Sequence, residues 1–440
     1  MRLPDPVRSL LSRLQAAGFS AYAVGGCVRD TLLGREPGDW DLCTSAMPEQ
    51  MEAVFRGEHV LETGLRHGTL SVVLNHVPYE ITTYRVDGDY TDHRHPDSVS
   101  FVDRIDQDLA RRDFTVNAMA CDPDGRILDL FEGRQDLDRR LIRCVGIPAH
   151  RFEEDALRIL RALRFASVLD FAIDPDTDQA IHALYPTLEK VAAERIRSEL
   201  VKLLCGPGAG RILRAYSDVI TFLIPCLKPA VGYQQDNPHH LYTVWEHTVR
   251  AVENVPPDPI LRTTMLLHDS GKPFTRTTDE KGIGHYRGHQ AASARLAAEV
   301  LKKLRFDRAS SDRIVRLVEA HDIPLSTDRK LLLRRLNRFG EEDLRALFLI
   351  HRADRIATGT RNPVHAQEHM EALNAALDAL LAEKPCYSLK DLQINGNDLM
   401  ALGIRGRDIG LTLENLLNRV IEESLPNEKA ALLAAVRCGD

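Results

Sequence analysis

Two aspartates separated by a single residue, Asp39 and Asp41 in the segment GDWDL, are the first side chains whose spacing suits catalysis. On a strand, residues two apart point to the same face, so the two carboxylates would repel each other unless a cation lies between them. Paired aspartates of this kind hold Mg²⁺ together with substrate phosphates. A solvated loop is the alternative interpretation. Glu80, in the strand-like run YEITTYR, is a candidate third carboxylate.

A glycine pair, Gly25 and Gly26, follows a short apolar run and precedes a helix-like segment that contains Arg29. The pattern predicts a strand, a tight turn and a helix. Glycines at such a turn let the backbone approach a phosphate, because the N–H groups at the helix start are free and Arg29 adds positive charge. An ordinary turn between a strand and a helix is the alternative.

A third set of charged side chains lies in the helical run EEDALRILRALRF. Asp155, Arg158 and Arg161 follow at three-residue spacing and are expected along one face of a helix, with Arg164 one step further. Cytosine and adenine both present an amino donor beside a ring-nitrogen acceptor, which a carboxylate and an arginine would match. Guanine and uracil present the reverse pattern and would leave both protein groups unpaired. The segment is thus suited to selecting C and A without a template, although taken alone it is more typical of a salt-bridged solvent face.

The elements that must position these side chains change in character along the chain. The first third mixes strand-like runs at 71–77, 79–86 and 127–131 with helical ones, whereas the periodicity from about Arg151 onward is almost wholly helical. The pattern predicts an α+β chain, with a mixed sheet in the head and a long helical body. Breaks between helices are expected where Gly or Pro residues interrupt the pattern, at 206–208, 255–257 and 383–385.

Composition limits the class, the location and the partners. The 440 residues, with 44% hydrophobic content and a formal net charge of −7, fit an ordinary globular protein of about two to four domains. No apolar run approaches the roughly 18 residues that a membrane helix needs, and the N-terminal segment does not fit a signal peptide. Eight scattered cysteines without a CxxC pair favour a reducing cytoplasm. The acidic balance excludes indiscriminate polyanion binding, but it leaves local nucleic-acid contacts open.

Five sequence blocks occur in a fixed order between about residues 20 and 205. They are GGCVRDTLLGREPGDWDLCT, RRDFTVNAMA, ILDLFEGRQDL, RFEEDALRILRALRF and AAERIRSELVKLL. Together they resemble the signature of the class II tRNA nucleotidyltransferases, the CCA-adding enzymes of the polymerase β superfamily. The resemblance implies a polymerase β-like head and template-independent addition of CCA to the 3′ end of tRNA, with CTP and ATP as substrates and pyrophosphate as the product.

The same resemblance assigns roles to residues. Asp39 and Asp41 would be the catalytic ligands of Mg²⁺, and Glu80 remains the candidate third carboxylate. The residues implied to bind the nucleotide or its triphosphate are Gly26, Arg29, Arg112, Asp155, Arg158, Arg161 and Arg164.

Several alternatives stay open. A CC-adding or A-adding tRNA nucleotidyltransferase and a poly(A) polymerase would use the same chemistry. The polar segment YRVDGDYTDHRHPDSVSF, with Arg85, Asp92 and Arg94 in the family's spacing, is expected to be a mobile loop and favours full CCA addition. A chain whose main activity lies in the histidine-rich body while its head only binds RNA, or a non-catalytic RNA-binding scaffold, would be of another class. The paired aspartates argue against both, because they would repel RNA unless a metal neutralised them.

Histidine is concentrated in the body, where nine of the 17 lie between His239 and His365. A set of histidines and aspartates on separate helical segments resembles the HD phosphohydrolase domain, whose pattern is H…HD…D. Taken singly, each histidine would be a core or surface residue. Imidazole and carboxylate ligands suit a transition ion such as Mn²⁺, Ni²⁺ or Co²⁺, or Mg²⁺ when a phosphate ester completes the shell. The implied metal ligands are His247, His268, Asp269, His289, His321 and Asp354.

Four domains are expected. They are a nucleotidyltransferase head at 1–145, a helical nucleotide-reading neck at 146–210, an HD body at 211–370 and a helical tail at 371–440. In the resemblance the tail helps grip the tRNA, and a cyclic phosphate on a damaged tRNA end is the expected substrate of an active HD site. The sequence predicts no oligomeric state and no membrane partner.

Overall fold

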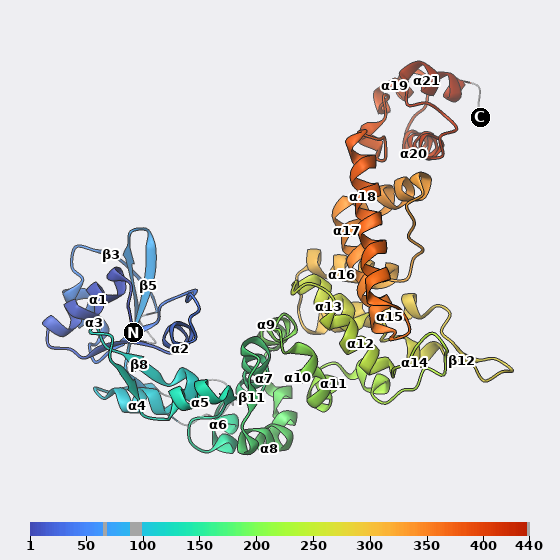
Figure 1. The fold of residues 1–440 in the computed structure, drawn as a ribbon. Coiled ribbons are helices and arrows are strands. Elements are labelled where there is room, and N and C mark those ends of the chain that lie inside the picture. Colours follow the sequence, from blue (N-terminus) through green and yellow to red (C-terminus); the bar gives the residue numbers. More distant parts are fainter. Residues whose placement is uncertain (65–67, 89–98, 438–440) are drawn as a thin grey trace. The chain divides into compact units, whose positions relative to one another are not determined.

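The structure is a computed structural model that describes residues 1–64, 68–88 and 99–437. The chain divides into two compact units, Met1–Pro225 and Cys226–Asp440 (Figure 1). The expected four-domain division is finer than these two units and stays a prediction. The loop residues Asp92 and Arg94 lie outside the described residues. No helix of the described residues is both long and apolar enough to cross a membrane.

The first unit opens with a seven-stranded mixed sheet, which confirms the predicted α+β fold class. The strand order is β3-β4-β5-β2-β1-β8-β9, in which β2 pairs with β5 in parallel and all other neighbours are antiparallel. The strand-like runs predicted at 71–77, 79–86 and 127–131 overlap β4, β5 and β9. The strands are β1 (Ala21–Val24), β2 (Leu42–Thr44), β3 (His59–Gly64), β4 (Thr69–Leu74), β5 (Val77–Thr83), β8 (Met119–Cys121) and β9 (Ile127–Asp129), with β6 (Arg85–Asp87) and β7 (Val99–Phe101) forming a separate ladder.

Short helices accompany this sheet. The first of them, α1, buries Val7, Leu10, Leu11 and Leu14, the i, i+3, i+4, i+7 stripe of an amphipathic helix. A cluster of Val24, Cys43, Tyr84, Leu109 and Ala120 joins the central strands to α4. The helices are α1 (Asp5–Ala16), α2 (Gly26–Leu32), α3 (Pro48–Val54), α4 (Ile105–Ala110) and α5 (Gly133–Arg139).

A helical region completes the first unit. Its elements are α6 (Pro148–Glu154), α7 (Leu157–Leu169), α8 (Pro175–Leu184), α9 (Ala193–Leu204), α10 (Ala209–Ala215) and α11 (Ser217–Leu223), with a two-residue ladder between β10 (Leu141–Ile142) and β11 (Ala172–Ile173). Helix α7 packs closely on α9, and the predicted break at 206–208 separates α9 from α10.

The expectation of one continuous helix through Asp155, Arg158 and Arg161 was wrong. Helix α6 ends at Glu154, Asp155 has an extended backbone (φ −137°, ψ 103°), and α7 begins at Leu157. The reason is local, because the Asp155 carboxylate accepts a hydrogen bond from the backbone N–H of Leu157 at 3.0 Å. An aspartate that caps a helix start in this way competes with the continuation of the preceding helix. Asp155 therefore lies at the junction of two helices.

The second unit is almost entirely helical. Its elements are α12 (Val244–Glu253), α13 (Pro259–Leu267), α14 (Lys272–Thr275), α15 (His289–Lys303), α16 (Arg308–Ala320), α17 (Arg329–Ala357), α18 (Pro363–Ala382), α19 (Gly396–Ala401), α20 (Arg407–Ile421) and α21 (Lys429–Arg437), with a short hairpin of β12 (Thr277–Thr278) and β13 (Gly284–His285). Gly340 interrupts α17, because its φ of 75° lies in the left-handed region. The C-terminal helices share an apolar core with α17 and α18 that includes Leu336, Leu377 and Leu417.

A close backbone approach fixes the turn that follows α13. A Cβ at Gly271 would lie 2.7 Å from the backbone oxygen of His289 and 2.7 Å from the backbone nitrogen of Ser293. The Gly271 N–H donates to the Ser293 hydroxyl at 2.9 Å. This turn carries His268 and Asp269, so the close contact of Gly271 with α15 places both residues next to the start of α15.

Candidate active site and candidate metal centre

The glycine turn of the head makes room for an arginine. Strand β1 ends at Val24, Gly25 has a φ of 78°, and α2 begins at Gly26, which confirms the predicted strand, turn and helix. A Cβ at Gly25 would lie 2.8 Å from Nη1 of Arg112. Gly25 is therefore required both by its backbone conformation and by the guanidinium that lies against it.

The two aspartates are placed just before a strand and not within it. Strand β2 begins at Leu42, so the expectation that Asp39 and Asp41 share one face of a strand was wrong. The backbone carbonyl of Asp41 continues the hydrogen bonding between β1 and β2, because it accepts from the Val24 N–H at 2.9 Å. Leu42 pairs with Ile81 in the parallel β2–β5 ladder, which brings Asp41 next to Glu80, one residue earlier on β5.

The electrostatics of Asp41 show that acidic groups gather there. The protein packed behind Asp41, and then the negative charges of Asp39 and Glu80, raise its pKa, while Arg112 opposes the shift. Carboxylates that lie close enough to repel one another form a site that a cation would stabilise. Beside Asp41 lies a cavity of about 210 Å³ whose lining includes Arg111 and Arg112. Of the three predicted carboxylates, Asp41 lines this cavity, and Asp39 and Glu80 lie close enough to Asp41 to affect its pKa.

A buried aspartate orients the two arginines of the RRD block. Asp108 accepts from Arg111 at 2.7 Å and from Arg112 at 3.3 Å, and its side chain is only 2% exposed. Burial alone would raise the pKa of Asp108, but the two guanidinium groups outweigh it and lower the pKa. Asp108 did not belong to the predicted site.

A second buried aspartate links the head to α7. Asp113 accepts two hydrogen bonds from Arg161, at 2.8 and 2.6 Å, and one from the side chain of Asn117 at 3.1 Å. Asn117 in turn accepts from Arg29 at 2.6 Å. Burial would raise the pKa of Asp113, but the Arg161 charge outweighs it and lowers the pKa to about 2. Arg29 of the head and Arg161 of α7 are therefore held by one continuous network.

An aromatic ring lies among the same arginines. The Phe165 ring centroid is 3.6 Å from the Arg164 guanidinium carbon, 5.0 Å from that of Arg29 and 5.5 Å from that of Arg161. Arg164 also donates to Glu199 on α9 at 2.7 Å. Cations over an aromatic face are attracted by its quadrupole, so this ring stabilises three positive charges that would otherwise repel one another.

The junction of α6 and α7 forms a polar cavity of about 310 Å³. Asp155 points to it and is oriented by Arg195 of α9, which donates to its carboxylate at 2.9 Å. Arg158 is held by Glu154 and by the backbone oxygens of Arg151 and Arg111, the latter two at 3.2 Å. The structure thus brings together most of the predicted nucleotide-reading set, although Arg164 is absent from this lining. The lining residues are Arg111, Arg112, Asp113, Asp155, Arg158, Arg161 and Arg195.

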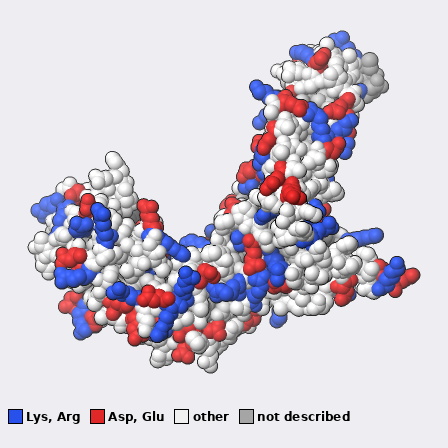
Figure 2. Space-filling view, viewed as in Figure 1, with Lys and Arg blue, Asp and Glu red and all other residues white. Residues whose placement is uncertain are grey.

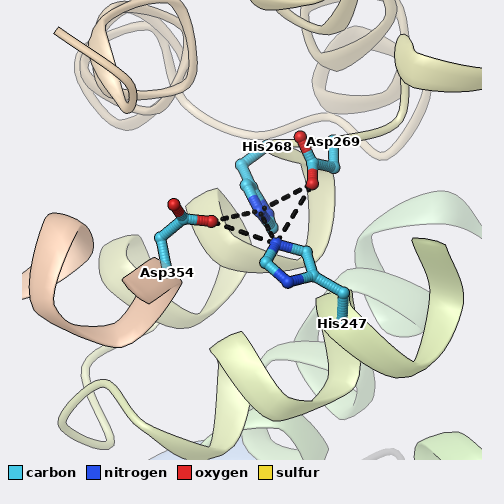
Figure 3. A group of neighbouring side chains, drawn as sticks. All are labelled: His247, His268, Asp269 and Asp354. Atoms are coloured by element: carbon cyan, nitrogen blue, oxygen red, sulfur yellow. Dashed lines mark hydrogen bonds and ion pairs between the residues drawn. The ribbon is translucent and has the colours of Figure 1, made fainter. Parts of the chain in front are cut away.

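In the second unit, four predicted metal ligands from three segments converge on one point (Figure 3). His247 Nε2 lies 3.1 Å from His268 Nε2, 3.0 Å from Asp354 Oδ1 and 3.1 Å from Asp269 Oδ2. His247 comes from α12, the His268-Asp269 pair follows α13, and Asp354 comes from α17. His247, His268 and Asp269 are at most 1% exposed.

The other two predicted ligands form a second group with the same aspartate. His289 Nε2 and His321 Nε2 lie 3.2 Å apart, and they are 3.4 and 3.8 Å from Asp269 Oδ1. His289 begins α15 and His321 follows the end of α16. All six residues predicted from the HD resemblance are therefore clustered in one centre.

The charges of this centre favour a bound cation. Burial disfavours a charged imidazole, but the Asp269 and Asp354 carboxylates outweigh it and raise the pKa of His268 to about 10. The same contacts hold the pKa of both carboxyl groups well below their usual range. Oδ2 of Asp269 lies 2.7 Å from the Lys272 ammonium group, whereas Oδ1 is buried and has no hydrogen-bond donor among the described residues. Buried carboxylate oxygens of this kind fit a metal, because an unpaired buried charge is costly.

A cavity of about 320 Å³ opens onto the centre. Lys272, His285 and Arg287 line it, and Lys272 approaches Asp269 at 2.7 Å. Sequence reasoning missed five further lining residues, since they belong to loops and helix ends without a periodic signal: Asn237, His240, Tyr286, Gln290 and Asp322.

Comparison with known proteins agrees with this arrangement. Residues 21–143 match the "Poly A polymerase head domain", residues 170–229 match the "Probable RNA and SrmB- binding site of polymerase A", and residues 290–436 match tRNA nucleotidyltransferase domain 2. A CCA-adding enzyme from Limosilactobacillus reuteri is 50% identical over 208 residues, which cover 47% of this chain and 51% of that protein. That alignment therefore spans about half of the relative's length.

Other matches extend over all or nearly all of the chain. A CCA-adding enzyme from Limosilactobacillus fermentum is 34% identical over 439 residues, covering 98% of this chain and 96% of that protein. The structure of the Bacillus stearothermophilus CCA-adding enzyme in complex with CTP has a TM-score of 0.74 and 30% identity, covering 100% of this chain and 99% of that one. The head fold and its site define a nucleotidyltransferase with a poly(A) polymerase-type head. The full-length relative identifies it further: the chain belongs to the family of CCA-adding enzymes.

The Asp113 network predicts a pH dependence of stability. The folded-state pKa of about 2 lies below the ordinary value of 3.8, so the stabilisation is fully present above about pH 4 and is lost as the pH falls towards 2. It amounts to roughly 2 kcal/mol of unfolding free energy. We expect Asp113→Asn to lower the stability at pH 6 and to lose this part of the acid dependence. Urea unfolding followed by Trp40 fluorescence, in a Trp245→Phe background, reports on the head alone because the chain has two tryptophans.

Asp138→Asn, on the exposed face of α5, is the matched control for the loss of one negative charge. Equal acid dependence of the Asp113 variant and the wild type between pH 5 and pH 2.5 would contradict the pairing.

Proposed function

We propose that this protein adds CCA to the 3′ end of tRNA without a template, using CTP and ATP and releasing pyrophosphate. The observation that carries the proposal is that the Asp41 carboxylate, with Asp39 and Glu80 close to it, feels the charge of Arg112, which also lines the polar cavity of the α6–α7 junction, in a chain related over its full length to CCA-adding enzymes. A cytoplasmic location stays a prediction from the cysteine pattern, as do the four domains.

The acidic residues would hold Mg²⁺, since the carboxylates around Asp41 fit a hard cation. Bound there, Mg²⁺ supplies charge stabilisation to phosphoryl transfer. Asp39 and Asp41 are the proposed ligands and Glu80 the candidate third. The side chains of this protein would then position the triphosphate. Arg112 lies against the glycine turn and is held by Asp108, and Arg29 is held by Asn117, which is bound to Asp113.

Nucleotide choice is assigned to the α6–α7 junction. Asp155 would accept from the amino group that cytosine and adenine share, while Arg158 would donate to the neighbouring ring nitrogen. Arg195 and the Leu157 N–H each occupy one carboxylate oxygen of Asp155, which leaves further lone pairs for a base. Arg161 remains bound to Asp113, and Arg164 remains bound to Glu199, so these two arginines would form the side of the site behind the base. The partners would be the tRNA 3′ end, CTP and ATP.

The addition is tested with tRNA that lacks CCA. With Mg²⁺, CTP and ATP, the wild type should extend the RNA by three nucleotides, and Asp39→Asn or Asp41→Asn should reduce the rate at least about 10³-fold, as loss of transition-state charge stabilisation does. Asp138→Asn should retain the wild-type rate. No extension by the wild type would refute the proposal.

The same assay separates the alternatives. With ATP alone and tRNA that ends in CC, a CCA-adding or A-adding enzyme adds one residue, whereas a poly(A) polymerase continues. With CTP alone and tRNA that lacks CCA, a CC-adding or CCA-adding enzyme adds two residues and an A-adding enzyme adds none.

A second function is favoured by the centre in the second unit. We propose that it is a metal-dependent phosphohydrolase of the HD class that acts on a phosphate ester, with a 2′,3′-cyclic phosphate on an RNA end as the candidate substrate. The support is the convergence of four histidines and two aspartates beside Lys272, His285 and Arg287. Mn²⁺, Ni²⁺, Co²⁺ or Mg²⁺ would suit these ligands.

Hydrolysis of 2′,3′-cyclic AMP tests this second function. Hydrolysis should require added divalent metal, and His268→Ala should abolish it while leaving CCA addition at the wild-type rate. Asp39→Asn should show the reverse pattern, and His365→Ala, at an exposed position outside the centre, should change neither activity. Equal hydrolysis by wild type and His268→Ala would count against the proposal.

A further inference from the structure

We infer that a basic cluster at one end of α17 and α18 binds the backbone phosphate that precedes the terminal phosphate of an RNA strand, and so selects RNA over mononucleotides. The inference rests on the proposed phosphohydrolase function and specifies its class of substrate. The basic cluster is made of His351, Arg355, Arg361 and His369, which belong to α17, to the loop after it and to α18.

Two helices bring these side chains together. His351 and Arg355 lie one turn apart on α17, and α18 packs against α17. The ring centroids of His351 and His369 are 5.8 Å apart, so this face of α17 is turned towards α18. Arg352 also donates to Gln367 at 2.9 Å and joins the same stretches of the two helices. The basic cluster is therefore a defined part of the packing between α17 and α18.

The positive charge of the basic cluster is not balanced by a neighbouring carboxylate. Neither Arg355 nor Arg361 has a carboxylate partner at ion-pair distance in the described part of the chain. Earlier on α17, Arg345 binds Asp378 of α18 at 2.5 Å, so the same two helices do balance their charges elsewhere. Burial and then the charge of Arg361 lower the pKa of Arg355, although Asp354 opposes the shift. A bound anion would offset this repulsion.

The two histidines respond to the same positive charge. Burial, followed by the charge of Arg355, lowers the pKa of His351 to about 4, although Asp354 opposes the shift. Burial and Arg355 also lower the pKa of His369. Both rings are therefore largely neutral at pH 7, and each has one N–H that can donate to a phosphate oxygen.

The position of Arg361 is unfavourable without an anion. Helix α18 begins at Pro363, and its first turn contains no acidic residue. The N-terminal end of a helix carries partial positive charge, so a cation just before it is destabilised and an anion is stabilised. The C-terminal end of α17 would account for Arg355, because cations are favoured there, but it does not account for Arg361. Both Arg361 and the start of α18 therefore indicate an anion at this place.

The basic cluster adjoins the proposed phosphohydrolase centre. Arg355 directly follows Asp354, which lines the cavity of the centre (Figure 3), and successive residues of a helix differ in direction by about 100°. The Leu241 N–H donates to the Thr358 carbonyl at 3.0 Å, which joins the loop between α17 and α18 to the segment that carries His240, another residue of the cavity lining. An RNA strand whose end lies in the cavity would thus bring its preceding phosphate to the basic cluster.

A backbone phosphate fits these side chains in charge and geometry. Arginine binds phosphate oxygens through two parallel N–H donors, and its charge is permanent. A mononucleotide such as 2′,3′-cyclic AMP has only the phosphate that would occupy the cavity, so it has no group for the basic cluster. An RNA strand carries a further phosphate at each preceding nucleotide.

Three substrates test the inference on the full chain, with the divalent metal that supports hydrolysis. They are 2′,3′-cyclic AMP, the dinucleotide ApA with a 2′,3′-cyclic phosphate at its 3′ end, and the same dinucleotide with an uncharged methylphosphonate linkage. We expect kcat/KM for the charged dinucleotide to exceed that for its methylphosphonate form at least about tenfold, as loss of a hydrogen bond to a charged group does.

Variants assign this advantage to the basic cluster. Arg355→Gln/Arg361→Gln should reduce the ratio of kcat/KM between the charged and uncharged dinucleotides to about one, whereas Arg355→Lys/Arg361→Lys should retain part of it. A merely structural role would lower both values alike and leave the ratio unchanged. Arg308→Gln is the matched control for loss of an arginine, because its side chain is 95% exposed at the start of α16, and it should keep the wild-type ratio.

The contrary outcomes have different consequences. Equal kcat/KM for all three substrates in the wild type would overturn the inference and leave the phosphohydrolase proposal standing. An advantage that both dinucleotides share over 2′,3′-cyclic AMP would also overturn it, because recognition would then lie in the second nucleoside. An unchanged ratio in Arg355→Gln/Arg361→Gln would exclude the basic cluster as the phosphate site. No hydrolysis of any of the three would overturn both proposals.

Discussion

The buried carboxylate of Asp113 is the interaction on which the arrangement of the first unit depends. Through one oxygen it holds Asn117, which holds Arg29 of the head, and through the other it holds Arg161 of α7. The triphosphate side and the base side of the proposed site are thereby fixed relative to each other by a single charge. Removing that charge would leave the Arg161 guanidinium with the more distant Glu199 carboxylate, at 3.9 Å, in place of its close partner.

In both sites, groups of the same kind lie close together, and groups of opposite charge beside them offset the repulsion. In the head, acidic groups gather at Asp41, while Arg29, Arg161 and Arg164 surround the ring of Phe165. In the second unit, four histidine nitrogens and two carboxylates meet in a buried space. On the face shown in Figure 2, Lys and Arg side chains alternate with Asp and Glu in both units. The net charge of −7 is therefore compatible with a local, selective contact to RNA.

Much of the fold and of the two candidate sites could be predicted from the sequence, because the sequence patterns that indicate them are local or are spread over several ordered blocks. The sheet strands, the Gly25 turn and the clustering of the four histidines and two aspartates of the second unit follow from such signals. The break between α6 and α7 could not be predicted from periodicity, because the Asp155 side chain decides it by capping α7. Asp108, Asp113 and Arg195 were missed as site residues, since their importance comes from contacts between distant segments.

The central claim is that protein side chains at the α6–α7 junction choose the nucleotide. Equilibrium binding of CTP, ATP, UTP and GTP to the full chain without tRNA measures it most directly, with Asp155→Asn for comparison. The account predicts that CTP and ATP bind at least about tenfold more tightly than UTP and GTP, the equivalent of one unpaired hydrogen bond. It also predicts that Asp155→Asn narrows this difference, because an amide both donates and accepts. Equal binding of all four nucleotides, or unchanged discrimination in the variant, would contradict the claim.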